Sequence, residues 1–434
     1  MLLVRRITNW KTTICILALG FLPFHSLLAQ ENSPYSRYGL GDQLPSQNIV
    51  TRGMGGLSVP YYDLQSINSV NPASYAQLKL TTFDIGLDLN TRTLVQSNPA
   101  KKYNAAYLIP SYMMLGFPLS RKGHWGMALG LRPLTRINYD LVDRKGVTPQ
   151  DSVGYLYKGS GGTYQAFLGM GFGTKRFTVG FNTGYKFGTK SYSTQTVFIN
   201  DTVNYKKSIS SDTTRFGGIF LDMGLQYSLP VGKNTFLRLG ANAGLMTKMK
   251  GLRDISRETV QYSATGTPIV IDSVYRSTGE KGTVVAPGHY GVGLLLERED
   301  RWLVGAEYSS TLWSQYEYYG LTEQLRNNWT VRLGGQFTPD INGKNYWGRS
   351  SYRVGFTYGN DLVAINDGLK QWSVTAGARF PLRRNFYTNQ YTSLNVALEW
   401  GTRGSQSSSL RDNFFRISIG FSLSDVWFQK RKYE

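Results

Sequence analysis

The sequence predicts an all-β protein, a 14-stranded antiparallel transmembrane β-barrel with an N-terminal plug inside the lumen. Three observations predict this class. Apolar and polar residues alternate along many segments, the connections between these segments are alternately short and long, and an irregular glycine-rich stretch precedes all of them. In outer-membrane barrels the apolar positions face lipid and the polar positions face the lumen, so the hydrophobicity of each strand is spread over alternate residues.

The first 29 residues have the pattern of a secretory signal peptide. Arg5, Arg6 and Lys11 form a basic region, a largely apolar run extends from Thr12 to Leu28, and Ala29 offers a small residue for cleavage. A membrane anchor is the alternative, but the run is short for a spanning helix. The expected parts are therefore a signal peptide over 1–29, a plug over 30–79 and a barrel over 80–434.

Composition excludes several classes of function. The single cysteine, Cys15, lies in the signal peptide, so the exported chain has no disulfide and no thiolate metal site. Removing the three basic residues of that peptide lowers the formal charge from +20 to +17 (20 − 3). An exported chain rarely meets nucleic acid, and no nucleic-acid motif is present. We expect the basic balance to serve anionic lipid or a periplasmic partner.

Alternation is clearest from Phe177 to Gly188. Phe, Val, Thr and Tyr occupy the odd positions, and Thr, Gly, Asn and Lys occupy the even ones. A soluble β-sandwich is the alternative. However, the expected inward parity is rich in glycine and isolated charges rather than in bulky surface residues, as at Asp84, Asp88, Asp222, Glu307, Arg332, Arg353 and Glu399.

Fourteen strand candidates cover the chain after the plug: 80–94, 111–118, 124–136, 156–172, 177–189, 213–229, 234–250, 287–297, 301–317, 328–338, 351–360, 370–381, 391–402 and 412–424. Long loops are expected at 137–155, 190–212 and 251–286, and mostly short turns lie on the other side. This arrangement is typical of outer-membrane barrels, with the short turns in the periplasm. We therefore expect the cell outer membrane as the location. Aromatic residues near the strand ends suit an interfacial girdle better than a ligand platform.

Catalytic patterns are not found. The exported chain has two histidines, His124 and His289, which are far apart in sequence, and a zinc site requires further ligands. Neither lies near a nucleophile-elbow serine, and the glycine runs at 159–162 and 169–173 fit the inward face of a strand better than a phosphate loop. The sequence therefore predicts no enzyme, no metal and no cofactor.

The stretch from Arg52 to Leu78 has no helical or strand period and precedes the first strand. It contains Gly53, Gly55 and Gly56, then Asp63, and then Asn71, Pro72 and Ala73. The glycines permit tight turns, and Pro72 favours an extended Asn71. A barrel of this width has a lumen that wall side chains alone do not fill. This stretch is the predicted plug.

Pro133 interrupts the third strand candidate, directly after Arg132. Proline cannot donate to a ladder, so a bulge or break is expected there. The alternative is that Pro133 lies beyond the membrane belt, where a lost hydrogen bond matters little.

These features together resemble the long-chain fatty-acid transport (FadL-type) family of outer-membrane proteins. The resemblance runs through Arg52–Gly56, Asp63 and Asn71–Ala73, followed by fourteen strands. The segments 32–42 and 427–432 resemble a divergent branch of that family.

The resemblance implies passive uptake of hydrophobic compounds such as long-chain fatty acids. Release into the membrane would be sideways at a kinked third strand, where Arg132 and Pro133 lie. Some relatives instead resemble scaffold or shuttle barrels of type IX secretion, so a non-transporting role in an outer-membrane protein complex is the alternative. The expected partners are outer-membrane lipid and lipopolysaccharide, a hydrophobic small molecule, and other outer-membrane or periplasmic proteins, with no nucleic acid.

Overall fold

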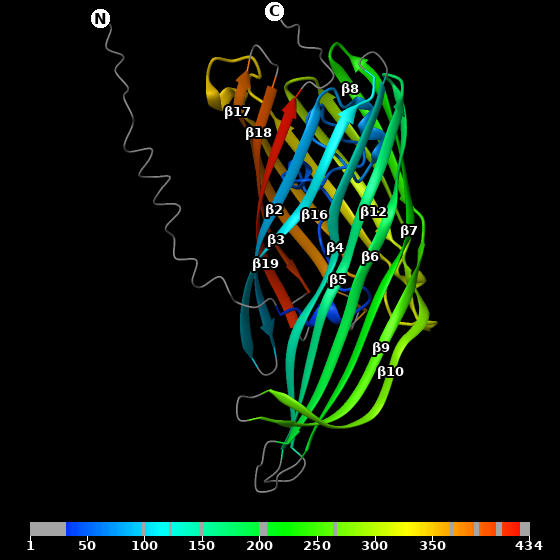
Figure 1. Cartoon of the computed structure of the whole chain (residues 1–434). Helices are drawn as coiled ribbons and strands as arrows, with labels where there is room; N and C mark the ends of the chain where they lie inside the picture. The colour runs from blue at the N-terminus through cyan, green and yellow to red at the C-terminus, as the bar shows by residue number, and fades with distance from the viewer. Residues whose placement is uncertain are drawn as a thin grey trace, which may run out of the picture.

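The computed structural model describes residues 32–97, 100–120, 124–146, 152–198, 206–263, 267–364, 369–385, 390–404 and 410–425. The expected signal peptide lies outside these ranges. Within them the chain forms a closed antiparallel barrel of 14 strand paths (Figure 1). The predicted fold class is confirmed.

The first half of the wall consists of β2 (Thr81–Gln96), β3 (Lys101–Pro118), β4 (His124–Gly146), β5 (Ser152–Gly173), β6 (Phe177–Phe198), β7 (Lys207–Gly232) and β8 (Thr235–Gly244). The second half consists of β11 (His289–Arg298), β12 (Trp302–Thr311), β15 (Asn328–Phe337), β16 (Ser351–Asn360), β17 (Lys370–Asn385), β18 (Gln390–Arg403) and β19 (Leu410–Asp425). β9 (Thr247–Tyr262) continues the path of β8 along β7, and β10 (Pro268–Ala286) leads into β11.

Pairing between β19 and β2 closes the barrel. Their ladder runs from Leu410↔Gln96 to Asp425↔Thr81 and so covers the full length of both strands. Closure leaves no free edge at this seam, which a membrane requires because lipid offers no hydrogen-bond partner.

Burial follows the alternation that the sequence shows. On β6, Phe177 and Tyr185 are exposed on the outside, whereas Thr178, Asn182 and Lys186 are buried on the lumen side. The apolar outer face of a closed barrel is stable only against lipid, so the protein lies in the cell outer membrane.

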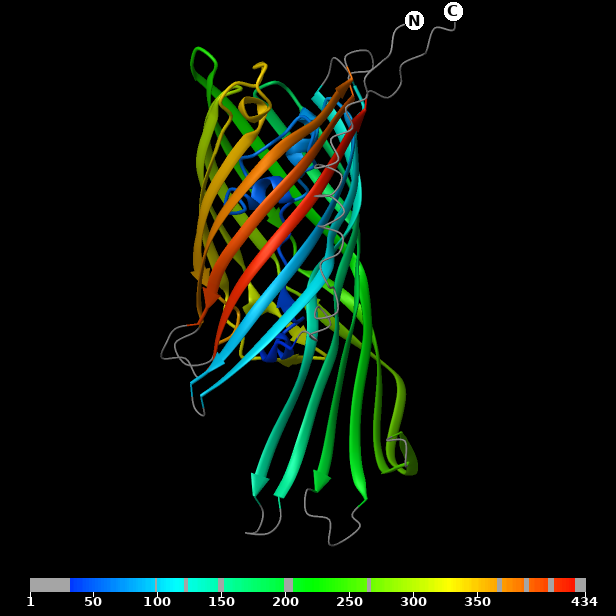
Figure 2. The ribbon, with the colours of Figure 1, turned by 90° about the vertical axis from the view of Figure 1, so that its left-hand side faces the viewer.

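The two ends of the barrel differ. Short turns join the strands at one end, which we call the turn end, and Figure 1 shows it at the top. At the other end, which we call the loop end, β4 to β7 with β9 and β10 project well beyond the rest of the wall (Figures 1 and 2). By the general architecture of such barrels the turn end is periplasmic and the loop end is outside.

The prediction of long loops at 137–155, 190–212 and 251–286 was wrong. Most of these residues extend the strands: β4 and β5 pair as far as Gly146↔Ser152, and β9 and β10 form a hairpin between β8 and β11. These segments carry many Ser, Thr and charged residues on both faces. The period-two apolar signal is therefore lost beyond the membrane, although the backbone stays extended.

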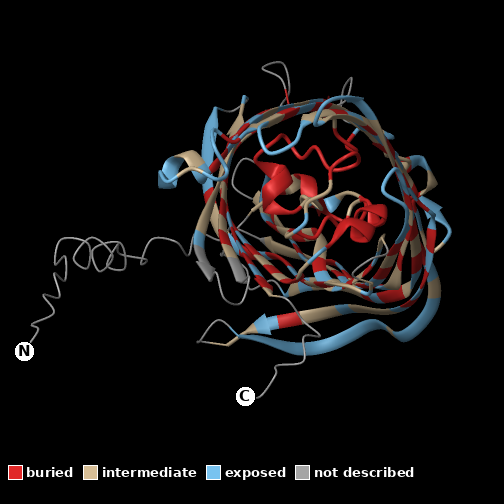
Figure 3. Cartoon of the chain, turned by 90° about the horizontal axis from the view of Figure 1, so that it is seen from above, coloured by how far each residue is buried: buried red, intermediate tan, exposed pale blue. Residues whose placement is uncertain are grey.

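Residues 32–80, which we call the N-terminal segment, lie inside the barrel, where they are largely buried (Figure 3). This segment contains η2 (Pro34–Arg37), β1 (Asp42–Gln43), α2 (Ile49–Arg52) and η3 (Pro72–Gln77). The Asn48 side chain accepts a hydrogen bond from the Thr51 amide and begins α2, and the Asn71 side chain caps η3 in the same way through Ala73. No helix among the described residues is long and apolar enough to span a membrane.

Two groups of apolar side chains hold this segment. Near the turn end, Ile49, Ile67 and Tyr75 pack with residues of the wall such as Met114 and Phe220. Near the loop end, Tyr35 and Leu40 join a cluster built mainly by the connection from β12 to β15, with Trp313 and Tyr316, and by Leu362, Val363 and Leu369. That connection contains η4 (Trp313–Gln315), β13 (Glu317–Tyr318) and β14 (Leu321–Thr322). The N-terminal segment thus spans the lumen between these two clusters.

Candidate functional site: the lumen and its N-terminal segment

The glycine group Gly53, Gly55 and Gly56 follows α2 and lies against the wall. Gly55 and Gly56 have φ of +66° and +81°, conformations that favour glycine. The Gly55 amide donates to Thr375 Oγ1 at 2.8 Å, and the same hydroxyl donates to the Gly53 carbonyl at 3.2 Å. Opposite them the wall also has glycine, at Gly334, Gly355 and Gly377, and a Cβ on any of these would collide with the N-terminal segment. The glycines on both sides therefore allow backbone-to-backbone contact.

Arg52 ends α2 and points into a polar site on β2 and β3. Its guanidinium pairs with Asp88 at 2.6 Å, donates to Ser111 Oγ at 2.9 Å, and also binds the carbonyls of Pro45 and Gln47 at 2.9 and 2.8 Å. The side chains of Arg52 and Asp88 are only 6% and 2% exposed. A buried charge pair of this kind is stable only with such additional hydrogen bonds.

Glu307 on β12 receives the backbone that follows the glycines. Its carboxylate accepts from the amides of Ser58 and Val59, both at 2.7 Å, and pairs with Arg332 of β15 at 3.0 Å. The sequence placed both charges inward, and the structure shows that they serve the N-terminal segment.

Asp63 forms an ion pair with Arg379 of β17. It also accepts from the Tyr61 hydroxyl and from the Gln65 amide, each at 2.9 Å. Burial alone would raise the pKa of the Asp63 carboxyl, but the guanidinium and these donors outweigh it and hold the pKa below its usual range. Asp63 is thus a charged anchor of the segment.

Asn71, Pro72 and Ala73 meet the opposite wall. The Asn71 side-chain amide donates to the Val59 carbonyl at 2.7 Å and to the Leu225 carbonyl of β7 at 3.2 Å. Asn71 is extended, with φ −123° and ψ 101°, as Pro72 predicts. Pro72 and Ala73 lie so close to Gly180 of β6 that a Cβ there would come within 2.5 Å of Pro72. The motif therefore fixes both the segment's own turn and its contact with the wall.

A second ionic group, which sequence analysis did not find, holds the segment near the loop end. Asp42 of β1 accepts from Arg92 of β2 and from Arg403 of β18, both at 2.8 Å. The two arginines also pair with Asp412 and Asp361. Burial would raise the pKa of Asp42, but the two guanidinium groups outweigh it and hold the pKa well below its usual range. These partners lie far apart in sequence, and no motif surrounds Asp42. The sequence alone therefore does not predict this ionic group.

Arg132 and Pro133 lie where the β3–β4 ladder stops. Six pairs, from Pro118↔Gly126 to Met113↔Leu131, join these strands, whereas the β4–β5 ladder continues to Gly146 with an irregularity between Pro133 and Thr135. The strands then diverge (Figure 2). The Arg132 side chain points inward and donates to the Ser46 carbonyl at 2.9 Å, to Ser69 Oγ at 3.1 Å and to Gln165 Oε1 at 3.1 Å.

The N-terminal segment takes up part of the β4 edge that β3 leaves. Asp42 and Gln43 pair with Arg136 and Thr135, and the Leu44 amide donates to the Leu134 carbonyl at 2.9 Å. The Ser33 amide makes the same kind of bond with Asn138, also at 2.9 Å. The chain's own N-terminal residues thus replace a missing neighbour strand over part of the gap.

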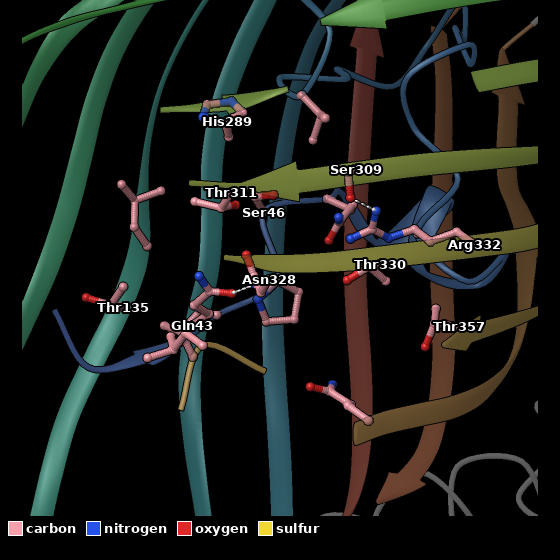
Figure 4. A pocket seen from close by; sticks show the side chains of 18 of the residues that line it. Gln43, Ser46, Thr135, His289, Ser309, Thr311, Asn328, Thr330, Arg332 and Thr357 are labelled. Atoms are coloured by element: carbon pink, nitrogen blue, oxygen red, sulfur yellow. Dashed lines mark hydrogen bonds between the residues drawn. The ribbon is translucent and has the colours of Figure 1, made fainter. Parts of the chain in front are cut away.

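A cavity of about 390 Å³ lies between the two apolar clusters. Figure 4 shows side chains pointing into it from the N-terminal segment (Gln43 and Ser46) and from β4, β11, β12, β15 and β16. Hydrogen bonds across it join Asn328 to Gln43 at 3.0 Å and Arg332 to Ser309 at 2.5 Å.

The cavity lining combines apolar side chains, such as Leu44, Val70 and Leu134, with many charged ones. Its ionisable side chains are Arg52, Arg92, Arg132, Lys186, Asp222, His289, Glu307, Arg332, Asp361, Glu399, Arg403, Asp412 and Arg416. Many of them pair with one another, as Arg416 does with Glu399 at 2.6 Å. An apolar solute that filled the whole cavity would have to displace water and separate hydrogen-bonded charges.

The described residues contain no group of three or more His, Cys, Asp or Glu side chains that could hold a metal ion. His124 begins β4 at the turn end, whereas His289 begins β11 and lines the cavity, so the structure does not bring them together.

The fold and this lumen define the class of protein: an outer-membrane β-barrel that carries its own N-terminal segment inside the wall. The chain belongs to the BamG family, whose family model matches residues 10–434. No curated protein matches the chain.

Solved structures share the fold at low sequence identity. The CymD monoaromatic hydrocarbon channel has a TM-score of 0.55 and 15% identity over 89% of this chain and 99% of its own. The toluene transporter TbuX of Ralstonia pickettii has the same TM-score and identity over 88% and 99%. A FadL homologue of Pseudomonas aeruginosa has a TM-score of 0.56 and 12% identity over 89% and 100%. The resemblance to FadL-type barrels is thereby confirmed for the fold, and the family is BamG.

Proposed function

We propose that this barrel does not transport solutes and acts as a structural component of an outer-membrane protein assembly, with the N-terminal segment as a permanent plug. One observation carries the proposal: the lumen is crossed by a segment tied to the wall through charge pairs, at Asp42, Arg52 and Asp63, around a charged cavity. A gate that opens in each transport cycle would have to break several buried pairs at once, each of them costly to separate.

The predicted plug residues support this role in the same way. Gly53, Gly55 and Gly56 seat the backbone against the wall, Asp63 supplies a charge pair, and Asn71, Pro72 and Ala73 fix the far side. Apolar side chains of the segment also pack against the wall on both sides of the cavity. A plugged barrel would offer partners its outer wall and its projecting strands.

Two experiments test the proposal. Liposomes whose outer leaflet is lipopolysaccharide, which slows the passage of apolar solutes, are loaded with a trapped fluorescent probe for hydrophobic solutes. Uptake of toluene and of oleate is compared between liposomes with and without the purified protein. We expect no difference. In parallel, the protein is extracted from outer membranes in mild detergent after crosslinking, and we expect it in a complex with other proteins. Recovery as a lone monomer together with uptake above the control would refute the assembly role.

Passage of a hydrophobic compound with lateral release is the second candidate. It is favoured by the end of the β3–β4 ladder next to Arg132 and Pro133, and by the likeness in fold to a monoaromatic hydrocarbon channel and a toluene transporter. Long-chain fatty acids would be one such compound. On this hypothesis the compound leaves the lumen between β3 and β4, and uptake in the liposome assay separates it from the assembly role.

A further inference from the structure

An outward basic group lies at the loop end of the wall, and neither the plug nor the cavity involves it. Lys248 and Lys250 of β9 and Lys281 of β10 are all exposed. We call these three residues the lysine triad. No hydrogen bond or ion pair joins any of them to the described residues, whereas the nearby Arg215 pairs with Asp254 at 2.8 Å. The triad therefore concentrates positive charge that no described ion pair offsets, and an exposed carboxylate beside it in the ladder, Glu317, lies across Val285 from Lys248.

The strand register places the three ammonium groups on the outer face. Gly217↔Lys250 pairs β7 with β9, and the next pair, Phe216↔Gly251, faces the lumen because Phe216 is buried in the loop-end cluster. Met249, between the two lysines of β9, is likewise buried in that cluster. Lys281 lies opposite Leu252, which is exposed on the same outer face. Residues two apart on one strand, and diagonal neighbours on adjacent strands, are about 7 Å apart. Lys250 therefore lies near both other lysines, and Lys248 and Lys281 lie at the two ends of the group.

The height of the triad coincides with the outer edge of the lipid-facing band. On β7 the outward apolar positions run from Leu229 to Ile219, which is 76% exposed. Ten residues of strand (229 − 219) rise about 33 Å along the strand. At a tilt of about 40° this is roughly 25 Å along the membrane normal, the usual height of the band. Lys250, opposite Gly217, lies one strand repeat beyond Ile219.

Outer-leaflet lipid supplies phosphate at this height. Lipopolysaccharide carries phosphate groups on its lipid A sugars, directly above the acyl chains. Charge complementarity and position therefore agree, with the apolar band against the acyl chains and the triad against the headgroup. We propose that Lys248, Lys250 and Lys281 bind the phosphate groups of lipid A at the outer wall of β9 and β10 (Figure 1).

The test uses the full chain, purified free of lipopolysaccharide, in detergent micelles. Binding of lipopolysaccharide is measured by native mass spectrometry beside the same lipid after enzymatic removal of its phosphates, and beside inorganic phosphate alone. We expect the phosphorylated lipid to bind most tightly. The variant Lys248→Gln/Lys250→Gln/Lys281→Gln should bind it on the order of 100-fold more weakly, about fivefold for each lysine.

Two control variants show that the position of the lysines matters. Lys370→Gln removes an isolated outward lysine at the loop end of β17, and Lys175→Gln/Lys233→Gln removes lysines of the turn end. Both should bind within twofold of the unmodified protein, and resistance to heat in gel electrophoresis checks that each variant is folded. Equal binding of the phosphorylated and dephosphorylated lipids would overturn the proposal. An unchanged affinity of the triple variant for the phosphorylated lipid would also overturn it, including the case in which the lysines crosslink to a protein instead. Binding of free phosphate as tight as binding of the lipid would overturn it as well.

Discussion

Gly355 of β16 lies directly against Gly55 of the N-terminal segment: a Cβ on Gly355 would come within 2.0 Å of the Gly55 nitrogen. Neither backbone can yield easily, because Gly355 belongs to ladders on both sides and Gly55 is hydrogen-bonded to Thr375. We expect Gly355→Ala to displace the N-terminal segment and to cost about 1–3 kcal/mol through overpacking. Limited trypsin digestion at Arg52 in intact outer membranes measures the displacement.

Gly146, at the loop end of β4, is the matched control for this change. No described residue lies within 4 Å of a Cβ placed there, so Gly146→Ala should leave digestion at Arg52 unchanged. Equal protection of Arg52 in both variants would mean that the contact at Gly355 does not hold the segment.

Arg52 and Asp88 provide the second prediction. Removing one partner of a buried pair leaves the other charge uncompensated and costs about 3–5 kcal/mol. We therefore expect Arg52→Ala to lower the urea midpoint of the refolded protein, whereas the double variant Arg52→Ala/Asp88→Asn should recover part of the loss. A double variant that is less stable than Arg52→Ala would show that Asp88 does not depend on Arg52 for its charge.

Acid should release the N-terminal segment only well below neutral pH. Because the pKa values of Asp42 and Asp63 are lowered in the folded protein, their stabilising contribution is complete above the unfolded value of about 3.9. It is then lost as the pH falls through the lower folded values. In the test, a Ser46→Cys variant is incubated at acidic pH, returned to pH 7 and then labelled with a maleimide. The cysteine should stay protected after incubation at pH 5 and should be labelled after incubation at pH 2–3. Labelling after incubation at pH 5 would contradict this, and Asp63→Asn should shift accessibility to higher pH.

Most strands of the barrel wall could be predicted from the alternation of apolar and polar residues, for a physical reason. A strand of the membrane band must be apolar outside and polar or small inside, so Phe177 and its neighbours leave a period of two. Beyond the band both faces of β9 and β10 meet water, and the constraint that produces the pattern disappears. The sequence pattern therefore predicts a loop at 251–286, where the structure has a hairpin.

The residues that fill the lumen could be predicted from the sequence only in part. Gly53, Gly55, Gly56 and Asn71–Ala73 stand out because backbone contact and capping demand particular residue types at fixed spacing. The Asp42 group did not stand out, because Arg92 and Arg403 reach it from strands at opposite ends of the chain. Only closure of β19 on β2 brings them together.

The end of the β3–β4 ladder provides the last prediction. Met113 and Leu131 are directly opposite and paired, so cysteines at these two positions should form a disulfide on oxidation, since paired residues have Cα atoms about 4.5–5.5 Å apart. Continued without a break, this register would place Tyr103 opposite Leu141, but β3 and β4 have separated there. A Tyr103→Cys/Leu141→Cys variant should therefore remain reduced under the same conditions, as measured by gel mobility. Efficient crosslinking of that outer pair would mean that the strands close against each other in the membrane, and lateral release between them would then have no exit.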